Sequence, residues 1–565
     1  ASRHDANPRA FAEKKADALR DANIDGVTSI SVAGPGFINF DVDETLLGRE
    51  ILASTDETSK DRDEKVIIEH TSPNPNKPLH MGTMRCAVLG DTVARLAERL
   101  GYQVEVQDYI NDLGRQSART VYAWQQFKDE LSDEDLEEKD DFWIGKLYSK
   151  AGKYLEEHED ERASVQSIIQ AIEEGDNETA ALKDDIVERS LKGQLETAYR
   201  TNIYYDLVAF ERDTVSSGLL EETVDQLMDL DRVYEIKDGD DAGCIVIDLS
   251  DYQDDIGEMK KPYKILFRSD GTATYTAKDI ALTMWKFGLV SSQFGYEEFD
   301  QQPDGTTLWR TGGNQEQTFG DADHVINVVG APQKFPMTVI EYSLRALGYE
   351  DEADQFSHCH FKFVYLPGKV SYSGRKGNWV GKHGDAVLHR CEDLAYEEVD
   401  QRYPEKDETT KELIAEKIAV AAVRYYLLRF GREKDIDFSF DDALDWEGDS
   451  GPYLLYSYAR AQGILDTVET RTDFSGTETA DGYQLLRTIE QFDTIVETSF
   501  QEKEPAKLAN YLKRLAEDFN SFYHSAPVKD ADPEIRKSRA ALVVGFQTVM
   551  EQGLELLGAE PVEQM

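Results

Sequence analysis

The chain has 565 residues, 40% of them hydrophobic, and a formal net charge of −49 at pH 7 from 111 acidic and 62 basic residues. A single hydrophobic core stops growing at roughly 250 to 300 residues, so we expect at least two domains. No apolar stretch approaches the roughly 18 residues of a membrane-spanning helix, and the opening ASRHDANPRA has no apolar signal core, which excludes a membrane protein and predicts a cytoplasmic one. The first residue is not Met, so an N-terminal truncation is one interpretation.

The acidic residues are spread over the whole chain, which allows two interpretations. One is a protein that repels nucleic acid. The other is adaptation to molar salt, where an acidic surface maintains solubility and the Debye length falls to about 3 Å. We favour the second, an extremely halophilic protein, because the excess is global while the hydrophobic content is ordinary. The net charge therefore does not exclude an RNA partner, whose phosphates contribute little at high salt.

The cysteines predict neither disulfides nor a zinc site, because none of them forms a CxxC pair. They are Cys86, Cys244, Cys359 and Cys391. The segment His358-Cys359-His360 has the alternation of a packed strand, with both histidines on one face. We expect no metal site in the protein.

The chain begins with a small module, which we place at residues 1–55. Residues 8–22 predict a helix, and residues 29–42 predict a strand interrupted by a Gly-Pro-Gly turn. A strand at residues 66–68 then precedes the stiff loop SPNPNKPLHMGT (72–83), a helix that ends near Gly101, and a further strand. This strand, loop, helix and strand form a βαβ unit, which predicts a parallel sheet.

We expect the catalytic domain to span residues 56–384, interrupted by a mostly helical insertion at about 117–260. The second half resumes at 263–281, where Asp270-Gly271 is a hairpin-turn signal. An apolar strand at 324–331, a helix, another strand at 360–366 and the loop GKVSYSGRKGNWV (368–380) follow. Residues 385–565 read as amphipathic helices. The fold class is therefore α/β, a Rossmann-like parallel-sheet domain with a helical insertion, joined to a C-terminal helical bundle and a remnant of a small α+β N-terminal domain.

The loop at 72–83 lies where open parallel sheets bind ligands, beyond a strand and before a helix N-terminus that attracts anions. Gly82 permits a phosphate or a flat ring to approach the backbone, and His80 and Lys77 supply hydrogen-bond donors. The prolines at 73, 75 and 78 hold those donors in place. The alternative is a stiff connector without a ligand.

Several motifs in this order resemble those of the arginyl-tRNA synthetases. The segment HMGT (80–83) resembles the HxGH nucleotide-binding motif of class I aminoacyl-tRNA synthetases, and SPNPNKPLHMG resembles the arginine-specific version. Further segments resemble successive parts of the same family, from the N-terminal domain to the tRNA-binding helices: AGPGFINF (33–40), QDYINDLGRQ (107–116), FRSDGTATYTAKDIA (267–281), HVINVVGAPQKFP (324–336), RKGNWV (375–380), GPYLLYSYARAQGIL (451–465) and GLELLGAEPVEQM (553–565).

This resemblance implies an arginine-tRNA ligase. Arginine is activated with ATP and Mg²⁺ to arginyl-adenylate, and the arginyl group then passes to the terminal adenosine of tRNA(Arg). It implies tRNA(Arg) and arginine as partners, and we expect a monomer. Two alternatives stay open, a tRNA-binding paralogue without activation activity and another adenylate-forming ligase of the superfamily. Little covalent chemistry falls to the protein, so catalysis should be positioning and charge stabilisation at the phosphates.

The resemblance also implies site residues. A carboxylate such as Asp279 can grip a guanidinium with two parallel hydrogen bonds, and a helical YTAKDIA would place it on one face with Tyr275. The residues implied to bind arginine are Ser72, Asn74, Asp108, Tyr275, Asp279 and Gln333. Those implied to bind ATP are Pro78, His80, Gly82, Thr83, Ser373, Arg375 and Lys376. The catalytic set comprises His80, Lys77, Thr83, Lys369 and Arg375. Those implied to bind tRNA are Phe37, Asn39, Tyr453, Tyr456, Arg460 and Met565.

Three positions depart from the family pattern. Thr83 replaces the last histidine of HxGH, and Asp108 stands where many members carry asparagine. The second ATP loop reads KVSYSGRKGNWV, which aligns either on Lys369 or, as we prefer, with Arg375 as the phosphate cation. Members that lack the usual second lysine rely on the lysine before HxGH, which is Lys77 here. In the C-terminal domain, Tyr453, Tyr456, Tyr458 and Arg460 are expected on one helix face, where aromatic rings suit unstacked anticodon bases.

Overall fold

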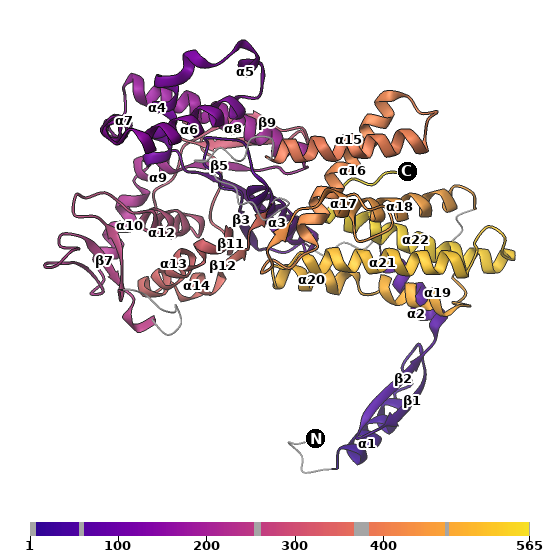
Figure 1. Cartoon of the computed structure of the whole chain (residues 1–565). Coiled ribbons are helices and arrows are strands. Elements are labelled where there is room, and N and C mark those ends of the chain that lie inside the picture. Colours follow the sequence, from indigo (N-terminus) through magenta and orange to yellow (C-terminus); the bar gives the residue numbers. More distant parts are fainter. Residues whose placement is uncertain (1–6, 56–60, 253–260, 366–382, 469–473, 564–565) are drawn as a thin grey trace.

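A computed structural model of the chain describes all residues except 1–6, 56–60, 253–260, 366–382, 469–473 and 564–565. Figure 1 shows a central sheet with a helical layer at one end, a long helical bundle on the other side, and an N-terminal module that projects away from the body. Among the described residues, no helix combines the length and the apolar character that a membrane span requires.

The central sheet has seven strands within the described ranges, in the order β12-β11-β3-β4-β5-β10-β9. Neighbouring strands run parallel from β12 to β10, and only β9 is antiparallel to its neighbour. Their bounds are β3 Lys65–Glu69, β4 Gln103–Ile110, β5 Leu207–Phe210, β9 Tyr296–Gln301, β10 Thr307–Thr311, β11 His324–Gly330 and β12 Phe356–Phe361. The chain runs from β3 to β4 on one side and later returns to β11 on the other, which creates a switch point between β3 and β11.

Both faces of this sheet are buried, as the short apolar run at β3 requires. Val66 and Ile68 face one core together with α3 (Met81–Arg99), whereas Ile67 faces a second core. The second core includes α12 (Tyr275–Lys286) and α13 (Lys334–Leu347). The predicted βαβ unit is therefore present as β3, α3 and β4.

The span 117–260 is not entirely a helical insertion. Its helices build a separate apolar core, and their bounds are α4 Gly114–Phe127, α5 Asp133–Glu137, α6 Asp140–Glu157, α7 Arg162–Glu174 and α8 Glu178–Arg200. However, β5 lies within this span and pairs with β4 in the central sheet. The chain thus returns to the sheet earlier than expected, because a four-residue strand is too short to give a recognisable alternation.

After β5 the chain forms short helices and a small antiparallel sheet before α12. These elements are α9 Glu211–Ser216, α10 Leu219–Met228, β6 Val233–Glu235, β7 Ile245–Asp248 and β8 Tyr263–Phe267. The predicted turn at Asp270-Gly271 follows β8, with Gly271 at φ +84°. The strand expected at 360–366 is displaced: β12 ends at Phe361, and β13 (Val364–Tyr365) pairs with β14 (Ile436–Asp437). In β12, Cys359 is buried and the rings of His358 and His360 lie 5.5 Å apart, as the alternation predicted.

The C-terminal part is helical as expected, and its core is continuous with the core on the α3 side of the sheet. Its helices are α15 Gly384–Arg402, α16 Glu408–Leu428, α17 Phe440–Ala443, α18 Gly451–Leu465, α19 Ala480–Ile489, α20 Phe492–Gln501, α21 Ala506–Ser525 and α22 Pro533–Leu556. Figure 1 shows α18, α21 and α22 running alongside one another, with α15 reaching toward the insertion.

The N-terminal module is a helix packed on a hairpin, followed by a helix docked on the bundle. Its elements are α1 Pro8–Asp21, β1 Val27–Ala33, β2 Phe37–Val42 and α2 Glu44–Ser54. The Gly-Pro-Gly segment is the tight turn of the hairpin, and it divides the predicted segment into β1 and β2 at the expected place. A Cβ on Gly36 would lie 2.8 Å from the carbonyl oxygen of Pro8, which requires glycine there.

Candidate active site

A cleft of about 1420 Å³ opens at the carboxyl ends of β3, β4 and β11. This is the position at which open parallel sheets bind ligands. The cleft is lined by ten of the residues that the sequence predicted to bind arginine or ATP or to act in catalysis: Ser72, Asn74, Lys77, Pro78, His80, Gly82, Thr83, Tyr275, Asp279 and Gln333. Strands and helices far apart in the sequence thus converge here.

One wall of the cleft is acidic. Asp279 and Tyr275 share a face of α12, as the i, i+4 spacing predicted, and both line the cleft. Burial, followed by the nearby charges of Glu69 and Glu211, raises the pKa of Asp279 to about 7. A cationic ligand nearby would therefore favour the ionised form of the Asp279 carboxyl group.

The two neighbouring acids already have lysine partners. Lys286 donates to Glu69 inside the core, and Lys278 donates to Glu211 at 2.9 Å. Among the residues that the structure describes, no lysine or arginine pairs with the Asp279 carboxylate. The arrangement leaves one carboxylate in this wall to bind a cation from the cleft.

The cleft also contains two uncharged polar groups that can bond to a ligand. The hydroxyl of Tyr109 and Oδ1 of Asn74 both belong to residues that line the cleft, and both atoms are buried without a hydrogen-bond partner in the described part of the chain. A buried polar atom that lacks a partner costs free energy, which a ligand recovers by bonding to it. Asn74 thus offers an acceptor oxygen to a bound ammonium group.

The phosphate-side wall is built by the loop at 72–83. His80 is the N-cap of α3, and its Nδ1 accepts a hydrogen bond from the Thr83 backbone N–H at 3.1 Å. Because Nδ1 accepts, the neutral ring carries its proton on Nε2. Burial and the charge of Lys77 lower the pKa of His80 to about 3, so the ring is neutral at pH 7. The Thr83 hydroxyl lies 3.3 Å from Nδ1, against the same ring.

Lys77 supplies a cation to this wall. Its Nζ donates to Oδ1 of Asn76 at 3.1 Å, and Nδ2 of Asn76 donates to Oε1 of Gln116 at 3.1 Å. Burial lowers the pKa of Lys77 to about 8. The ammonium lies on the cleft side of a helix N-terminus, a combination that suits an anion such as a phosphate.

Asp108 does not line the cleft, unlike the other residues predicted to bind arginine. It is 1% exposed, and its Oδ1 accepts a hydrogen bond from the Ser72 backbone N–H at 2.8 Å. Burial raises its pKa well above the usual range. Thr71 and Ser72 have positive φ values of 67° and 39°, so Asp108 braces a strained turn beneath the loop.

Other predicted residues lie elsewhere in the molecule or outside its described part. Phe37 and Asn39 are exposed on β2, and Tyr453, Tyr456 and Arg460 share a half-buried face of α18. Tyr458 is buried instead, because it lies five residues after Tyr453 and therefore on a different face of the helix. The predicted residues outside the described ranges are Lys369, Ser373, Arg375, Lys376 and Met565.

The site residues named from the sequence leave out much of the cleft lining, including Glu69, Tyr109, Gln116 and Gln194. Glu69 ends the buried strand β3, and an acid at the carboxyl end of such a strand was a signal that could have identified it. The two glutamines come from α4 and α8 of the insertion, and nothing in their local sequence indicates that they reach the cleft. In the described residues, no group of three or more His, Cys, Asp or Glu side chains is arranged to hold a metal ion.

Three family models match the chain. The model of the class I (R) tRNA synthetase catalytic domain matches residues 48–291 and 290–440, the DALR anticodon binding domain matches 454–565, and the arginyl tRNA synthetase N terminal domain matches 1–42. The catalytic-domain match ends at residue 440 and the DALR match begins at residue 454. The domain boundary at 384/385 stays a prediction.

Curated relatives and solved structures agree with these models. The arginine-tRNA ligase of Thermococcus kodakarensis is 40% identical over 94% of this chain and 86% of its own length, and that of Pyrococcus furiosus is 38% identical over 95% and 88%. The Thermus thermophilus arginyl-tRNA synthetase structure superposes with a TM-score of 0.88 at 30% identity, covering 99% of this chain and 92% of that one. The Plasmodium falciparum arginyl-tRNA synthetase shares the fold, with a TM-score of 0.72 at 19% identity over 98% and 89%. The chain belongs to the family of arginyl-tRNA synthetases, with the class I catalytic fold and a DALR anticodon-binding domain.

Proposed function

We propose that the cleft carries out the arginine-tRNA ligase reaction of this family, with arginine against the acidic wall and ATP against the loop at 72–83. The observation that carries the proposal is the Asp279 carboxylate, which faces the cleft beside two acids that already have lysine partners. A guanidinium satisfies such a carboxylate with two parallel hydrogen bonds, which a lysine ammonium cannot reproduce.

The rest of the amino acid fits the neighbouring groups. The α-ammonium group donates to Oδ1 of Asn74, a buried acceptor that lacks a partner within the described residues. Tyr275 and Gln333 border the guanidinium side, and Glu69 adds negative potential behind it. The arginine carboxylate then points toward the loop, where the nucleotide phosphates lie.

In the first step an arginine carboxylate oxygen bonds to the α-phosphorus of ATP, and the bond to the β-phosphate oxygen breaks, so that pyrophosphate leaves. Lys77 and the Nε2–H of His80 stabilise the charge on the phosphates, and Thr83 contributes a hydroxyl donor in place of the histidine of HxGH. In the second step a ribose hydroxyl of the terminal adenosine, the 2′-hydroxyl in class I enzymes, takes the arginyl group and AMP leaves. The carboxylate is ionised at neutral pH, so the first step needs no general base.

Mg²⁺ enters, in this proposal, with the nucleotide. Mg²⁺ is commonly held by substrate phosphates rather than by a protein cage. Bound to ATP, it neutralises phosphate charge. We assign the same phosphate-binding role to Ser373, Arg375, Lys376 and Lys369, which lie outside the described ranges.

We further propose that the enzyme acts as a monomer in the cytoplasm of an extreme halophile. The tRNA then contacts Phe37 and Asn39 of the N-terminal hairpin, and Tyr453, Tyr456 and Arg460 of α18 together with Met565. The large acidic excess supports the halophilic assignment, because such surfaces retain solubility at molar salt.

The test is charging of tRNA(Arg) with labelled arginine in high potassium chloride, with lysine, citrulline and canavanine as competitors. Asp279→Asn should raise the KM for arginine far more than the KM for ATP. No charging of any arginine tRNA would overturn the ligase proposal, and equal effects on both KM values would overturn the assignment of Asp279. ATP–pyrophosphate exchange with and without tRNA separates activation from transfer.

A further inference from the structure

Helix α8 of the insertion presents three polar side chains on successive turns, Gln194, Thr197 and Arg200. Gln194 is 2% exposed and Thr197 is fully buried, although both lie on a helix that the sequence placed in a peripheral insertion. Burying a polar side chain costs free energy unless it forms hydrogen bonds. The hydrogen-bond partners of Gln194 and Thr197 therefore indicate their role.

Gln194 holds the loop that carries Lys77. Its Nε2 donates to the backbone carbonyl oxygen of Asn74 at 3.1 Å and to that of Lys77 at 2.7 Å. One amide group thus bonds to both ends of the segment 74–77. A second insertion helix adds Gln116, whose Oε1 accepts from Asn76, the residue that in turn accepts from the Lys77 ammonium. The insertion therefore fixes both the backbone and the ammonium orientation of Lys77.

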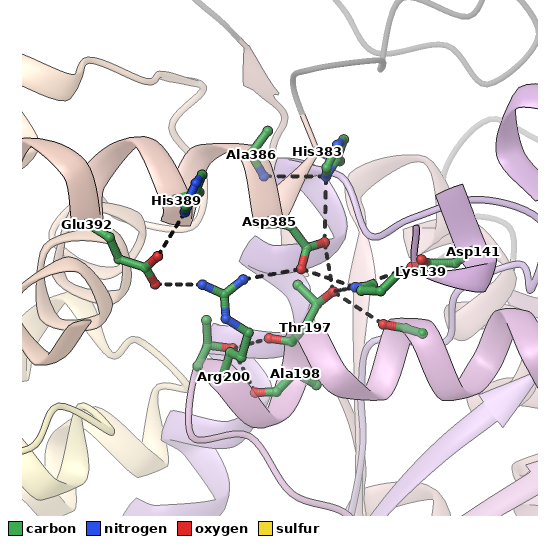
Figure 2. Close-up of polar contacts among 12 residues, drawn as sticks. Lys139, Asp141, Thr197, Ala198, Arg200, His383, Asp385, Ala386, His389 and Glu392 are labelled. Carbon is green, nitrogen blue, oxygen red and sulfur yellow. Dashed lines mark hydrogen bonds and ion pairs between the residues drawn. The ribbon is translucent and has the colours of Figure 1, made fainter. Parts of the chain in front are cut away.

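Thr197, one turn further along α8, holds the start of α15. Its hydroxyl lies 2.9 Å from Oδ2 of Asp385 and donates to it, while Lys139 donates to the Thr197 oxygen at 2.7 Å and to Oδ1 of Asp385 at 3.1 Å. Arg200 adds an ion pair to Asp385 at 3.5 Å. Figure 2 shows these side chains of α8 and Lys139 converging on Asp385 in the first turn of α15.

The carboxylate of Asp385 is well suited to this role. Burial opposes its charge, but the hydrogen bond to His383, the Lys139 ammonium and the Thr197 hydroxyl hold its pKa well below the usual range. It therefore stays ionised at neutral pH, where its contacts attach α15 to α8.

The starts of α15 and α3 meet directly. His383, the N-cap of α15, forms an antiparallel backbone bridge with His80, the N-cap of α3. The backbone N–H of Gly384 donates to the carbonyl oxygen of Leu79 at 2.7 Å. A Cβ on Gly384 would lie 3.0 Å from Cγ of Met84, so glycine permits this close approach. Gln194 therefore contacts the loop that leads to His80, and Thr197 contacts the start of α15, which bridges to His80.

We propose that Gln194 and Thr197 are positioning residues for adenylate formation, which set Lys77 and His80 in place by bonding α8 to the loop at 72–80 and to the start of α15. The inference rests on the proposed binding of the ATP phosphates by Lys77 and His80. The insertion helix then acts mainly on the ATP half of the site, while the acidic wall proposed to bind the guanidinium carries Glu69 of β3 and Asp279 of α12.

The experiment uses the full chain in high potassium chloride. Gln194→Leu and Thr197→Val remove the hydrogen bonds with little change of shape, Thr197→Ser retains the hydroxyl, and Lys192→Gln is the matched control on the exposed face of the same helix, where Lys192 pairs with Glu188. ATP–pyrophosphate exchange gives kcat and the KM values for ATP and arginine. Equilibrium arginine binding and thermal melting are measured on every variant, and Lys77→Met and His80→Ala serve as benchmarks.

We expect kcat/KM for ATP to fall about tenfold or more in Gln194→Leu and in Thr197→Val, since small displacements of a positioned group have effects of this size. Arginine affinity should change less than about twofold in Thr197→Val, and it should fall less than kcat/KM for ATP in Gln194→Leu, because Gln194 also bonds to the backbone of Asn74. All parameters of Thr197→Ser and Lys192→Gln should change less than about twofold. A lower melting temperature with an unchanged kcat/KM for ATP would overturn the proposal. An equal loss of kcat/KM for ATP and of arginine affinity would overturn it as well. Full exchange activity in Lys77→Met and His80→Ala would instead overturn the phosphate assignment, and with it the basis of the inference.

Discussion

Arg424 of α16 and Asp91 of α3 form a buried ion pair that joins the C-terminal helices to the catalytic sheet. Arg424 also donates to the carbonyl oxygens of Leu557 and Thr201, so one guanidinium connects α16, α22 and the end of α8 to α3. The anticodon-binding helices are thereby attached to the helix whose N-terminus carries His80. Because Arg424 is fully buried and bonds to all of these elements, its substitution should affect several of them at once.

Arg424→Met should lower the free energy of unfolding by about 3 to 5 kcal/mol, because it leaves Asp91 with Arg95 alone and strands two buried carbonyl oxygens. Denaturant titration in high salt measures the change. Arg162→Met, which breaks an exposed pair with Glu159, is the control and should cost less than about 1 kcal/mol. A loss below about 1 kcal/mol for Arg424→Met would contradict the role given to this pair.

Arginine binding should strengthen as the pH rises toward 7. The pKa of Asp279 is raised to about 7 in the free enzyme, so the carboxylate that pairs with the guanidinium is protonated at lower pH. Below pH 7 the affinity should fall by up to about tenfold per unit, and binding should release a proton. Calorimetry in buffers of different ionisation enthalpy measures both. In Asp279→Asn the remaining weak binding should be independent of pH, and a retained pH dependence would assign it to another group.

The activation step should lose activity above about pH 8. Burial lowers the pKa of Lys77 to about 8, and the ammonium that contacts phosphate is lost as the pH rises through this value. The measurement is kcat/KM for ATP in pyrophosphate exchange between pH 6 and 10. Lys77→Arg stays charged across this range, so its lower activity should show no such decline. The same alkaline limb in Lys77→Arg would exclude Lys77 as its source.

Asp108→Asn should stabilise the protein at neutral pH with little effect on activity. The pKa of Asp108 is raised in the folded state, so burying this carboxyl group costs nothing extra while it is protonated. Its contribution to the free energy of unfolding is complete below the unfolded pKa of about 3.9 and declines as the pH rises. Asparagine keeps the oxygen that accepts from the Ser72 N–H and cannot ionise. The free energy of unfolding should therefore exceed that of the parent at pH 7 and match it near pH 4. Lower stability at pH 7 would mean that the negative charge itself is needed.

The sequence alone predicted the family, the α/β catalytic fold and the helical C-terminal part. Ten of its candidate site residues line the cleft, and their roles stay predictions. The predictions of the fold and of these positions succeeded because their signals are local: the loop SPNPNKPLHMGT is contiguous, Tyr275 and Asp279 share one helix face, and the apolar run at β3 is bounded by turn residues. For such features, adjacency in the chain fixes adjacency in space. The order of the residues is therefore enough to locate the ligand-facing loop.

Only the tertiary structure decided which distant elements meet. The strand β5 joins the sheet although its four residues carry no distinctive pattern, and Asp108 lies beneath the cleft rather than in its lining. Gln194 reaches the loop at Lys77, and His383 meets His80, because α8 and α15 pack against the start of α3. The residue types at these positions are common on helices and at caps, so their partners follow from packing and not from spacing. The sequence determined what the loop is, and the packing of the insertion determined what holds it in place.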